Sequence, residues 1–248
     1  ESDYFAMRRA SLRRGADVDD TWTSQGSWIG ACRYDWELGP DFADGVGVLH
    51  EGDIVVAADA SLYYRDDLRN ALRAANVEPT GSSPSHLISA TYRAWGVEGI
   101  RRLEGDFAFI LWDKRQRLLV GARDLHGSRP LFFAQAGSRL VMASCLSAVV
   151  AHPGISRDIN RAALACSLVN ASSTLVEETE FRAVSRIPAG CMVRWLPGRT
   201  PVVERFAEAP LFEQADNVGP EEAAQRLREV LGLAVRERLA STGLTSVW

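Results

Sequence analysis

The densest group of residues that could do chemistry follows a predicted strand in the middle of the chain. Arg123 and Asp124 come directly after the apolar run Leu118 to Ala122, and Gly127 and Arg129 follow closely. An arginine beside an aspartate can order a site loop through bidentate hydrogen bonds. The same two residues can also form an ion pair that simply ends a strand. We favour the second, structural interpretation.

The other reactive side chains are scattered. The four histidines have no metal-binding spacing: His50, His86, His126 and His152. The four cysteines form no C-x-x-C pair: Cys32, Cys145, Cys166 and Cys191. We therefore predict no metal site, histidines that are at the surface or satisfied in the core, and mostly buried, reduced thiols. No nucleophile elbow, phosphate loop or dinucleotide fingerprint occurs, so the residues alone identify no reaction and no catalytic residue.

Composition limits the classes of protein to consider. The chain has 248 residues, of which 46% are hydrophobic and 24% charged, and its formal net charge is −4. No apolar run approaches the roughly 20 residues that a membrane span needs. With no long run of either charge, nothing favours nucleic acid or an anionic membrane as a partner. We expect a folded cytoplasmic protein.

Helices are expected at the N-terminus, in the first half and near the C-terminal end. The candidate stretches are Ser2 to Arg14, Asp66 to Ala75, Ser83 to Trp95, Asn160 to Val169 and Glu221 to Leu239. The third is the best signalled, because Ser83 can cap it and Pro84 occupies the favoured first helical position.

Strand patterns come in pairs separated by turn residues, which is typical of hairpins. The pairs are Gly45 to His50 with Ile54 to Ala58, Phe107 to Trp112 with Leu118 to Ala122, Leu131 to Ala134 with Leu140 to Ala143, and Met192 to Trp195 with Pro201 to Phe206. Successive hairpins predict antiparallel sheet and an α+β domain over residues 1–207. Residues 208–248 read as a polar linker, an amphipathic helix and a first strand of a second domain at Thr245 to Trp248.

Long motifs in the middle of the chain resemble the asparagine synthetase family. Residues 103–113 read LEGDFAFILWD and residues 122–132 read ARDLHGSRPLF, similar to the family's LxGxFAFxxWD and ARDxxGxxPLYY. Shorter matches are RGAD at 14–17, YRAWG at 92–96, MAS at 142–144 and RIPAG at 186–190. The resemblance covers nearly the whole chain, and the order and spacing of its motifs are specific.

The resemblance implies the class II glutamine amidotransferase fold, an N-terminal-nucleophile αββα sandwich with two antiparallel sheets. It also implies that the last helix leads into an ATP-dependent synthetase domain, whose SGGxDS loop holds pyrophosphate and which uses ATP and Mg²⁺. In the family a nucleophilic cysteine opens a strand ahead of a helix like Ser2 to Arg14. Glu1 cannot act as that nucleophile, and Ser2 belongs to a helix start, so we assign no catalytic residue here.

The sequence departs from the family where glutamine would bind. The family's Asn-Gly-Glu, which supplies an oxyanion-hole amide, a close backbone approach and a carboxylate, is replaced by Asp59, Ala60 and Ser61. The family's SDxE, which supplies a second carboxylate, reads Ser83, Pro84, Ser85 and His86. A carboxylate at the oxyanion position would raise the barrier by about 3 kcal/mol or more. We predict a degenerate glutamine pocket at Asp59, Ala60, Ser61, Pro84 and His86 that does not hydrolyse glutamine.

A degenerate domain of this kind is similar to those of β-lactam synthetases and lasso-peptide cyclases, which adenylate a carboxylate that an amine of the same substrate then attacks. Residues 58–68, ADASLYYRDDL, resemble the ADxRIDNRDEL form of lasso-peptide cyclases. The interpretation we favour is a macrolactam-forming cyclase with a precursor peptide, or a small carboxylate, as substrate and biosynthetic proteins as possible partners. The alternatives are a ligase for another substrate, a non-catalytic peptide-binding or scaffold domain, or a glutaminase with an upstream cysteine.

Overall fold

The computed structural model describes residues 2–24, 26–39, 45–169, 177–208 and 218–239. Its helices are α1 (Ser2–Ser11), α2 (Arg65–Ala74), α3 (Pro84–Trp95), α4 (Leu146–Ala151), α5 (Arg161–Leu168) and α6 (Pro220–Arg238). Its strands are β1 (Val18–Ser24), β2 (Ser27–Arg33), β3 (Val48–Glu51), β4 (Ile54–Leu62), β5 (Gly105–Asp113), β6 (Leu118–Arg123), β7 (Phe132–Ala136), β8 (Arg139–Ala143), β9 (Ser185–Arg186), β10 (Cys191–Trp195) and β11 (Val202–Arg205).

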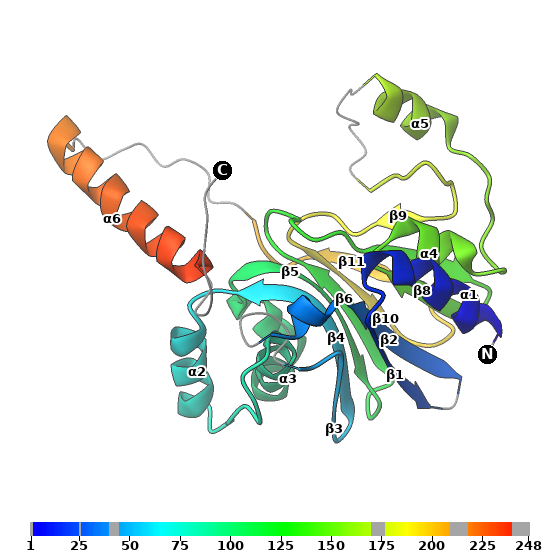
Figure 1. Ribbon diagram of the computed structural model, residues 1–248, viewed down its shortest axis with the longest axis horizontal. Helices are drawn as coiled ribbons and strands as arrows, with labels where there is room; N and C mark the ends of the chain where they lie inside the picture. The colour runs from blue at the N-terminus through cyan, green and yellow to red at the C-terminus, as the bar shows by residue number, and fades with distance from the viewer. Residues whose placement is uncertain (1, 25, 40–44, 170–176, 209–217, 240–248) are drawn as a thin grey trace.

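The described strands form three antiparallel sheets. A six-stranded sheet has the order β11-β10-β6-β5-β4-β3, a three-stranded sheet has the order β8-β7-β9, and β1 pairs with β2 alone. Helix α3 packs on β3 and β4, while α1 and α4 pack on each other and cover β2, β7 and β8 (Figure 1). The architecture is therefore the expected α+β arrangement, with two sheet layers between helical layers.

The main core lies between the six-stranded sheet and the α2–α3 layer. Alternate residues of β4 face it, with Val56, Ala58 and Ala60 at most 9% exposed, because side chains alternate between the faces of a strand. Phe107 on β5 and Leu72 on α2 complete its centre and are almost fully buried. Asp59 and Ser61 lie on the opposite face of β4, which turns toward the second sheet layer.

All four predicted hairpins are present. Ile54–Leu62 pairs with Val48–Glu51 across the turn at Gly52, and β5 with β6, β7 with β8 and β10 with β11 form the other three. The cap of α3 is also as expected, since the Ser83 hydroxyl accepts a hydrogen bond from the backbone N–H of His86. Local turn and cap chemistry therefore determines most of these elements.

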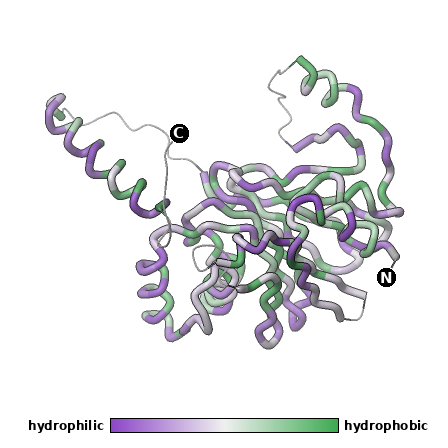
Figure 2. Tube along the Cα trace, in the orientation of Figure 1, coloured by the Kyte–Doolittle hydropathy of each residue, from purple (hydrophilic) through white to green (hydrophobic). Residues whose placement is uncertain are grey.

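Helix α6 is present, but its apolar face has no core to pack on within the described structure. Leu227, Val230 and Leu231 are each more than half exposed. Figure 2 shows hydrophobic and polar stretches alternating along this helix, which extends away from the sheets. The predicted strand at Thr245 to Trp248 and most of the predicted linker lie outside the described residues.

Candidate functional site

Asp59, Ala60, Ser61 and Pro84, four of the five residues predicted for a degenerate glutamine pocket, line one small cavity. The cavity has a volume of about 50 Å³ and lies beside the end of β4 and the start of α3. Its other lining residues are Arg33, Trp36, Glu37, Ala58, Ser85 and Arg129. Residues from both faces of β4 line it, Ala58 and Ala60 as well as Asp59 and Ser61, so the cavity lies along an edge of the strand.

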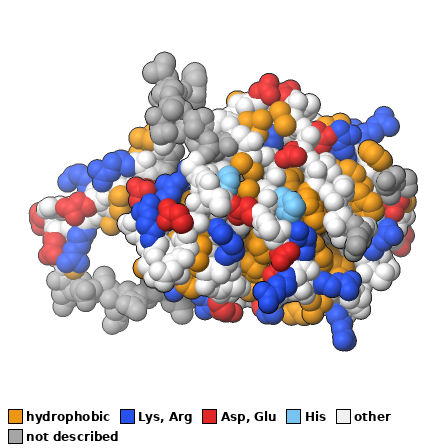
Figure 3. Space-filling view, turned by 90° about the horizontal axis from the view of Figure 1, so that it is seen from below, with side chains coloured by type: hydrophobic (Ala, Val, Ile, Leu, Met, Phe, Trp, Pro, Cys, Tyr) orange, Lys and Arg blue, Asp and Glu red, His pale blue; other side chains and the backbone are white. Residues whose placement is uncertain are grey.

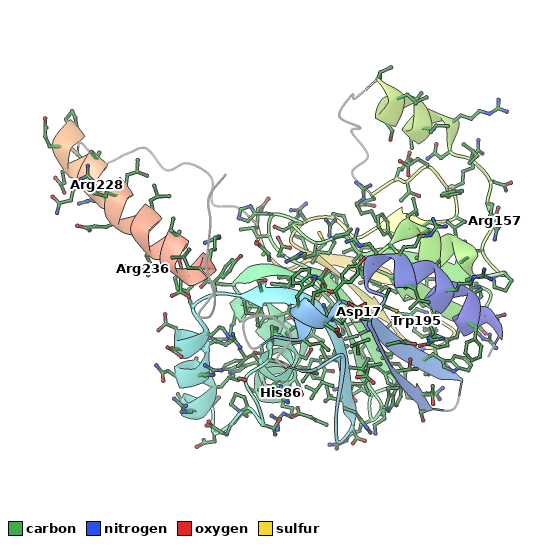
Figure 4. All side chains as sticks on the ribbon, viewed as in Figure 1. Asp17, His86, Arg157, Trp195, Arg228 and Arg236 are labelled. Atoms are coloured by element: carbon green, nitrogen blue, oxygen red, sulfur yellow. The ribbon has the colours of Figure 1, made fainter. Side chains whose placement is uncertain are left out.

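His86 does not join this cavity. Its Nδ1 atom lies 2.7 Å from the Ser83 hydroxyl, and its ring packs against Gly81. The side chain therefore turns back on the start of α3, where Figure 4 labels it. His86 therefore lies apart from the other four predicted pocket residues, because a position in the first helical turn does not fix the direction of its side chain.

Two arginines line the cavity, and each has N–H groups that lack a close hydrogen-bond partner among the described residues. Arg33 is 8% exposed and donates to the carbonyl oxygen of Ala58, while its Nη1 atom lies 3.9 Å from the Glu37 carboxylate. The Nε atom of Arg129 lies 3.6 Å from Asp59 Oδ1. Both Nε atoms are buried without a hydrogen-bond partner among the described residues. Charge-assisted hydrogen bonds are shorter, about 2.7–2.9 Å, so these ion pairs are loose.

Arg33 is a site residue that the sequence prediction missed. It ends β2, directly after the apolar run Trp28 to Cys32. A charged residue that closes an apolar strand was the available signal, but only the packing of β2 beside β4 brings it to Asp59.

Arg123 and Asp124 organise the loop that carries Arg129. The Arg123 guanidinium donates to the carbonyl oxygens of Gly127, Arg129 and Ile187. The Asp124 carboxylate, fully buried, accepts from the backbone N–H groups of Phe107, His126 and Ser128. The hydrogen bonds of Arg123 and Asp124 go mostly to loop and strand backbone rather than to each other. Of the two interpretations, loop ordering describes these contacts and a strand-ending ion pair does not.

Burial lowers the pKa of Arg123, and the nearby Arg186 lowers it further. The guanidinium nevertheless remains charged at neutral pH, since the ordinary pKa of an arginine lies far above neutrality. The loop is therefore held by three charge-assisted bonds.

A much larger cavity, about 380 Å³, lies between the two sheet layers. The six-stranded sheet provides its floor with Phe109, Ile110 and Trp112, and α1 contributes Tyr4 and Arg8. Its two sides are the strands β2 and β8, each of which has a described neighbour on one edge only. The cavity thus lies between the two-stranded and the three-stranded sheet.

Cys32 and Cys145 also line this large cavity. Burial raises the pKa of the Cys32 thiol, and Arg8 offsets part of that rise. All four cysteines are free, but only Cys191 is fully buried and the other three are half-buried, which corrects the expectation of mostly buried thiols. Within the described residues, no cluster of three or more His, Cys, Asp or Glu side chains is arranged to hold a metal ion.

Comparison with known proteins identifies the family. A family model described as a glutamine amidotransferase domain matches residues 1–206. The chain belongs to this glutamine amidotransferase family.

Relatives of the amidotransferase domain include asparagine synthetases. The chain is 33% identical over 116 residues to asparagine synthetase [glutamine-hydrolyzing] 3 of Bacillus subtilis, covering 46% of this chain and 19% of that protein. It is 31% identical over 192 residues to a putative asparagine synthetase of Mycobacterium bovis, covering 73% of this chain and 29% of that protein. The chain thus spans less than a third of the length of these relatives.

Two further similar proteins are an amidase and an amidotransferase of known structure. The chain is 28% identical over 184 residues to amidase chyE of Penicillium rubens, covering 71% of this chain and 25% of that protein. Among solved structures, a glutamine phosphoribosylpyrophosphate amidotransferase from B. subtilis matches with a TM-score of 0.53 and 14% identity, covering 83% of this chain and 46% of that one. This structural likeness supports the amidotransferase fold.

The described part of the chain contains no helix that is both long and apolar enough to cross a membrane. On the face drawn in Figure 3, basic and acidic side chains are interspersed.

Proposed function

We propose that this chain is the amidotransferase-like part of an ATP-dependent, amide-bond-forming enzyme in which glutamine hydrolysis has been lost. The observation that carries the proposal is Asp59 beside the candidate pocket, paired with Arg129 at 3.6 Å. In acyl transfer, negative charge develops on the oxygen that the oxyanion hole binds, and one missing donor costs about 3–4 kcal/mol of barrier. A carboxylate at the aligned position repels that charge as well as failing to donate.

The pocket also offers poor partners for the ammonium group of glutamine. The aligned carboxylate positions hold Ser61 and His86, and Asp59 faces Arg129. The remaining carboxylate, Glu37, accepts a 2.7 Å hydrogen bond from the backbone N–H of Tyr34 and lies near Arg33. An ammonium group would have to compete with these existing contacts for a partner.

The large cavity between β2 and β8 bears on the alternative of a retained glutaminase. An extended segment placed there would meet strand edges that have no neighbour among the described residues, and in that alternative it would carry an upstream cysteine. The test is to incubate the longest natural polypeptide that contains this chain with glutamine and to measure glutamate. We expect no release above background, and release that depends on an upstream cysteine would reject the proposal.

We assign the bond-forming activity to a second domain, to which α6 leads. In this proposal residues 1–207 belong to the amidotransferase-like domain and residues 208–248 to the second domain. The exposed apolar positions of α6 support this division, because Leu227, Val230 and Leu231 need a covering surface. ATP and Mg²⁺ would bind in that following domain, and the described residues hold no phosphate loop.

We further propose that the product is a macrolactam and the substrate a precursor peptide, in a cytoplasmic enzyme. The support is the likeness of residues 58–68 to lasso-peptide cyclases, together with a pocket that no longer needs to release ammonia. The test is AMP formation by the full-length enzyme with a leader-free precursor peptide, compared with free aspartate. AMP formed with aspartate instead would favour a different ligase, and AMP formed with neither would favour a scaffold domain.

A further inference from the structure

The last turn of α6 contacts Tyr63 and Tyr64, the two residues that follow β4 along the chain. The Tyr64 backbone N–H donates a 2.7 Å hydrogen bond to Glu237 Oε2. The Arg238 guanidinium lies over the Tyr63 ring, 4.2 Å from its centroid. Within α6, Ala234 and Glu237 are half-buried and every other residue is exposed. The helix is therefore held to the described structure near its C-terminal end, as Figure 1 also shows.

Tyr63 connects this contact to the loop that carries Arg129. Its hydroxyl donates a 2.7 Å hydrogen bond to Asp106 Oδ2, and the Ser128 hydroxyl donates to Asp106 Oδ1 at 3.1 Å. Burial and the Asp106 carboxylate raise the pKa of Tyr63 to about 12, so the phenol keeps its proton at neutral pH. The Asp106 carboxylate thus accepts hydrogen bonds from both the Tyr63 and the Ser128 hydroxyl groups.

The same chain of contacts ends in the pocket. Ser128 precedes Arg129, whose guanidinium pairs with Asp59. Asp106 lies opposite Ser61 in the β4–β5 pairing, so the network runs along the sheet beside the pocket. A displacement of Arg129 would move Ser128 with it, because Asp124 and Arg123 hold residues 124–129 as one ordered loop.

We propose that Glu237 and Arg238 form a latch on Tyr63 and Tyr64. The strength of this latch depends on the Asp59–Arg129 pair. The latch and the pair are connected through Ser128, Asp106 and Tyr63. A ligand or partner that separates Asp59 from Arg129 loosens α6, and by thermodynamic reciprocity release of α6 changes the affinity of the pocket for that ligand. The significance of this coupling for an enzyme rests on the proposed function, since α6 would lead into the bond-forming domain. The contact between α6 and Tyr63–Tyr64 does not depend on the proposed function.

The first experiment measures the latch by hydrogen–deuterium exchange of α6 amides in the 248-residue chain. A helix of this length is only marginally stable without tertiary contacts, so its exchange reports how firmly it is held. We expect the double variant Glu237→Ala/Arg238→Ala to speed exchange in α6 by about tenfold. The matched control is Arg228→Ala/Arg236→Ala, two positions on the same helix labelled in Figure 4, which should leave exchange unchanged. Equal exchange in both double variants would overturn the latch.

The second experiment tests the coupling with Arg129→Ala in two backgrounds. In the wild-type background it should speed α6 exchange several-fold, while exchange in α3 stays constant and so excludes general unfolding. Tyr63→Phe keeps the ring under Arg238 but removes the bond to Asp106, so in that background Arg129→Ala should have no further effect. The same increase in both backgrounds, or none in either, would overturn the coupling. If Arg129→Ala changes hydrogen exchange in α3, Asp59→Asn gives a second way to weaken the Asp59–Arg129 ion pair. Because exchange needs no turnover, failure here is distinct from failure of the proposed activity.

Discussion

Asp59 Oδ1 and Arg129 Nε face each other at 3.6 Å across the candidate pocket. A carboxylate supplied by β4 thus lies against a guanidinium supplied by the loop after β6. In place of a neutral hydrogen-bond donor, the pocket contains a fixed negative charge that is already paired. This pair is the feature by which, in the proposed function, the domain departs from its glutamine-hydrolysing relatives.

Replacing Asp59 by Asn should change stability little and should not restore glutaminase activity. Asp59 and Arg129 are both about a third exposed, so their ion pair contributes at most about 1 kcal/mol. Ser61 and His86 would still offer no carboxylate to glutamine. Urea unfolding and a glutamate-release assay check the two expectations, the second in a polypeptide that begins with cysteine. Glutamate formed by Asp59→Asn alone would mean that this single residue silences the site.

Gly105→Ala should be strongly destabilising. Gly105 has φ +145, a conformation essentially restricted to glycine, and an added Cβ would lie 2.3 Å from the carbonyl oxygen of Ser61. The strands β4 and β5 would have to separate beside the pocket, at a cost of several kcal/mol. Gly52→Ala is the matched control: its φ is +57 but the space around it is open, so about 1 kcal/mol is expected. Similar denaturant midpoints for the two variants would contradict this account.

Asp124→Ala should destabilise the chain by roughly 3–5 kcal/mol, since it leaves several buried N–H groups without an acceptor. Those donors are the backbone N–H groups of Phe107, His126 and Ser128. Asp124→Asn keeps one acceptor oxygen and should lose less. The measurement is the midpoint of urea unfolding for both variants. A smaller loss for alanine than for asparagine would show that the buried charge, rather than its hydrogen bonds, dominates.

Stability should fall at alkaline pH. Burial and hydrogen bonds to carboxylates raise the pKa of Tyr63 to about 12 and raise that of Tyr92 as well, from about 10 in the unfolded chain. Between these values the unfolded state releases protons that the folded state retains, so stability is fully present below pH 10 and declines as pH rises toward 12. The check is urea unfolding over this range with Tyr63→Phe and Tyr92→Phe, each of which should make the decline shallower. An unchanged slope in both would remove tyrosine ionisation as the cause.

Elements with a strong local signal could be predicted from the sequence. Ser83 and Pro84 determine the start of α3, and the turn at Gly52 determines the β3–β4 hairpin. Strand β1 was missed because Val18–Ser24 reads VDDTWTS, which has few apolar residues and depends on pairing with β2. Helix α4 was missed because Leu146–Ala151 is short and its two consecutive valines favour a strand pattern.

The candidate site could be predicted only in part. Asp59, Ala60 and Ser61 were found because they are adjacent in sequence and align with a motif. Arg33 and Glu37 come from another sheet and a separate turn, and nothing local indicates that the fold brings them to the same cavity. Side-chain direction was the other source of error, as His86 shows.

The packing of α1 on α4 has a consequence for the order of folding during synthesis. Residues 2–11 can meet the β1–β2 hairpin early, through the Arg8–Asp19 ion pair, but they also lie against a helix that begins only at Leu146, so this second contact cannot form until the ribosome has made β8 and α4. Contacts of such long sequence separation form late and slowly. The face of α1 that packs on α4 is therefore among the last surfaces to be covered, and a nascent chain would expose it to chaperones in the meantime.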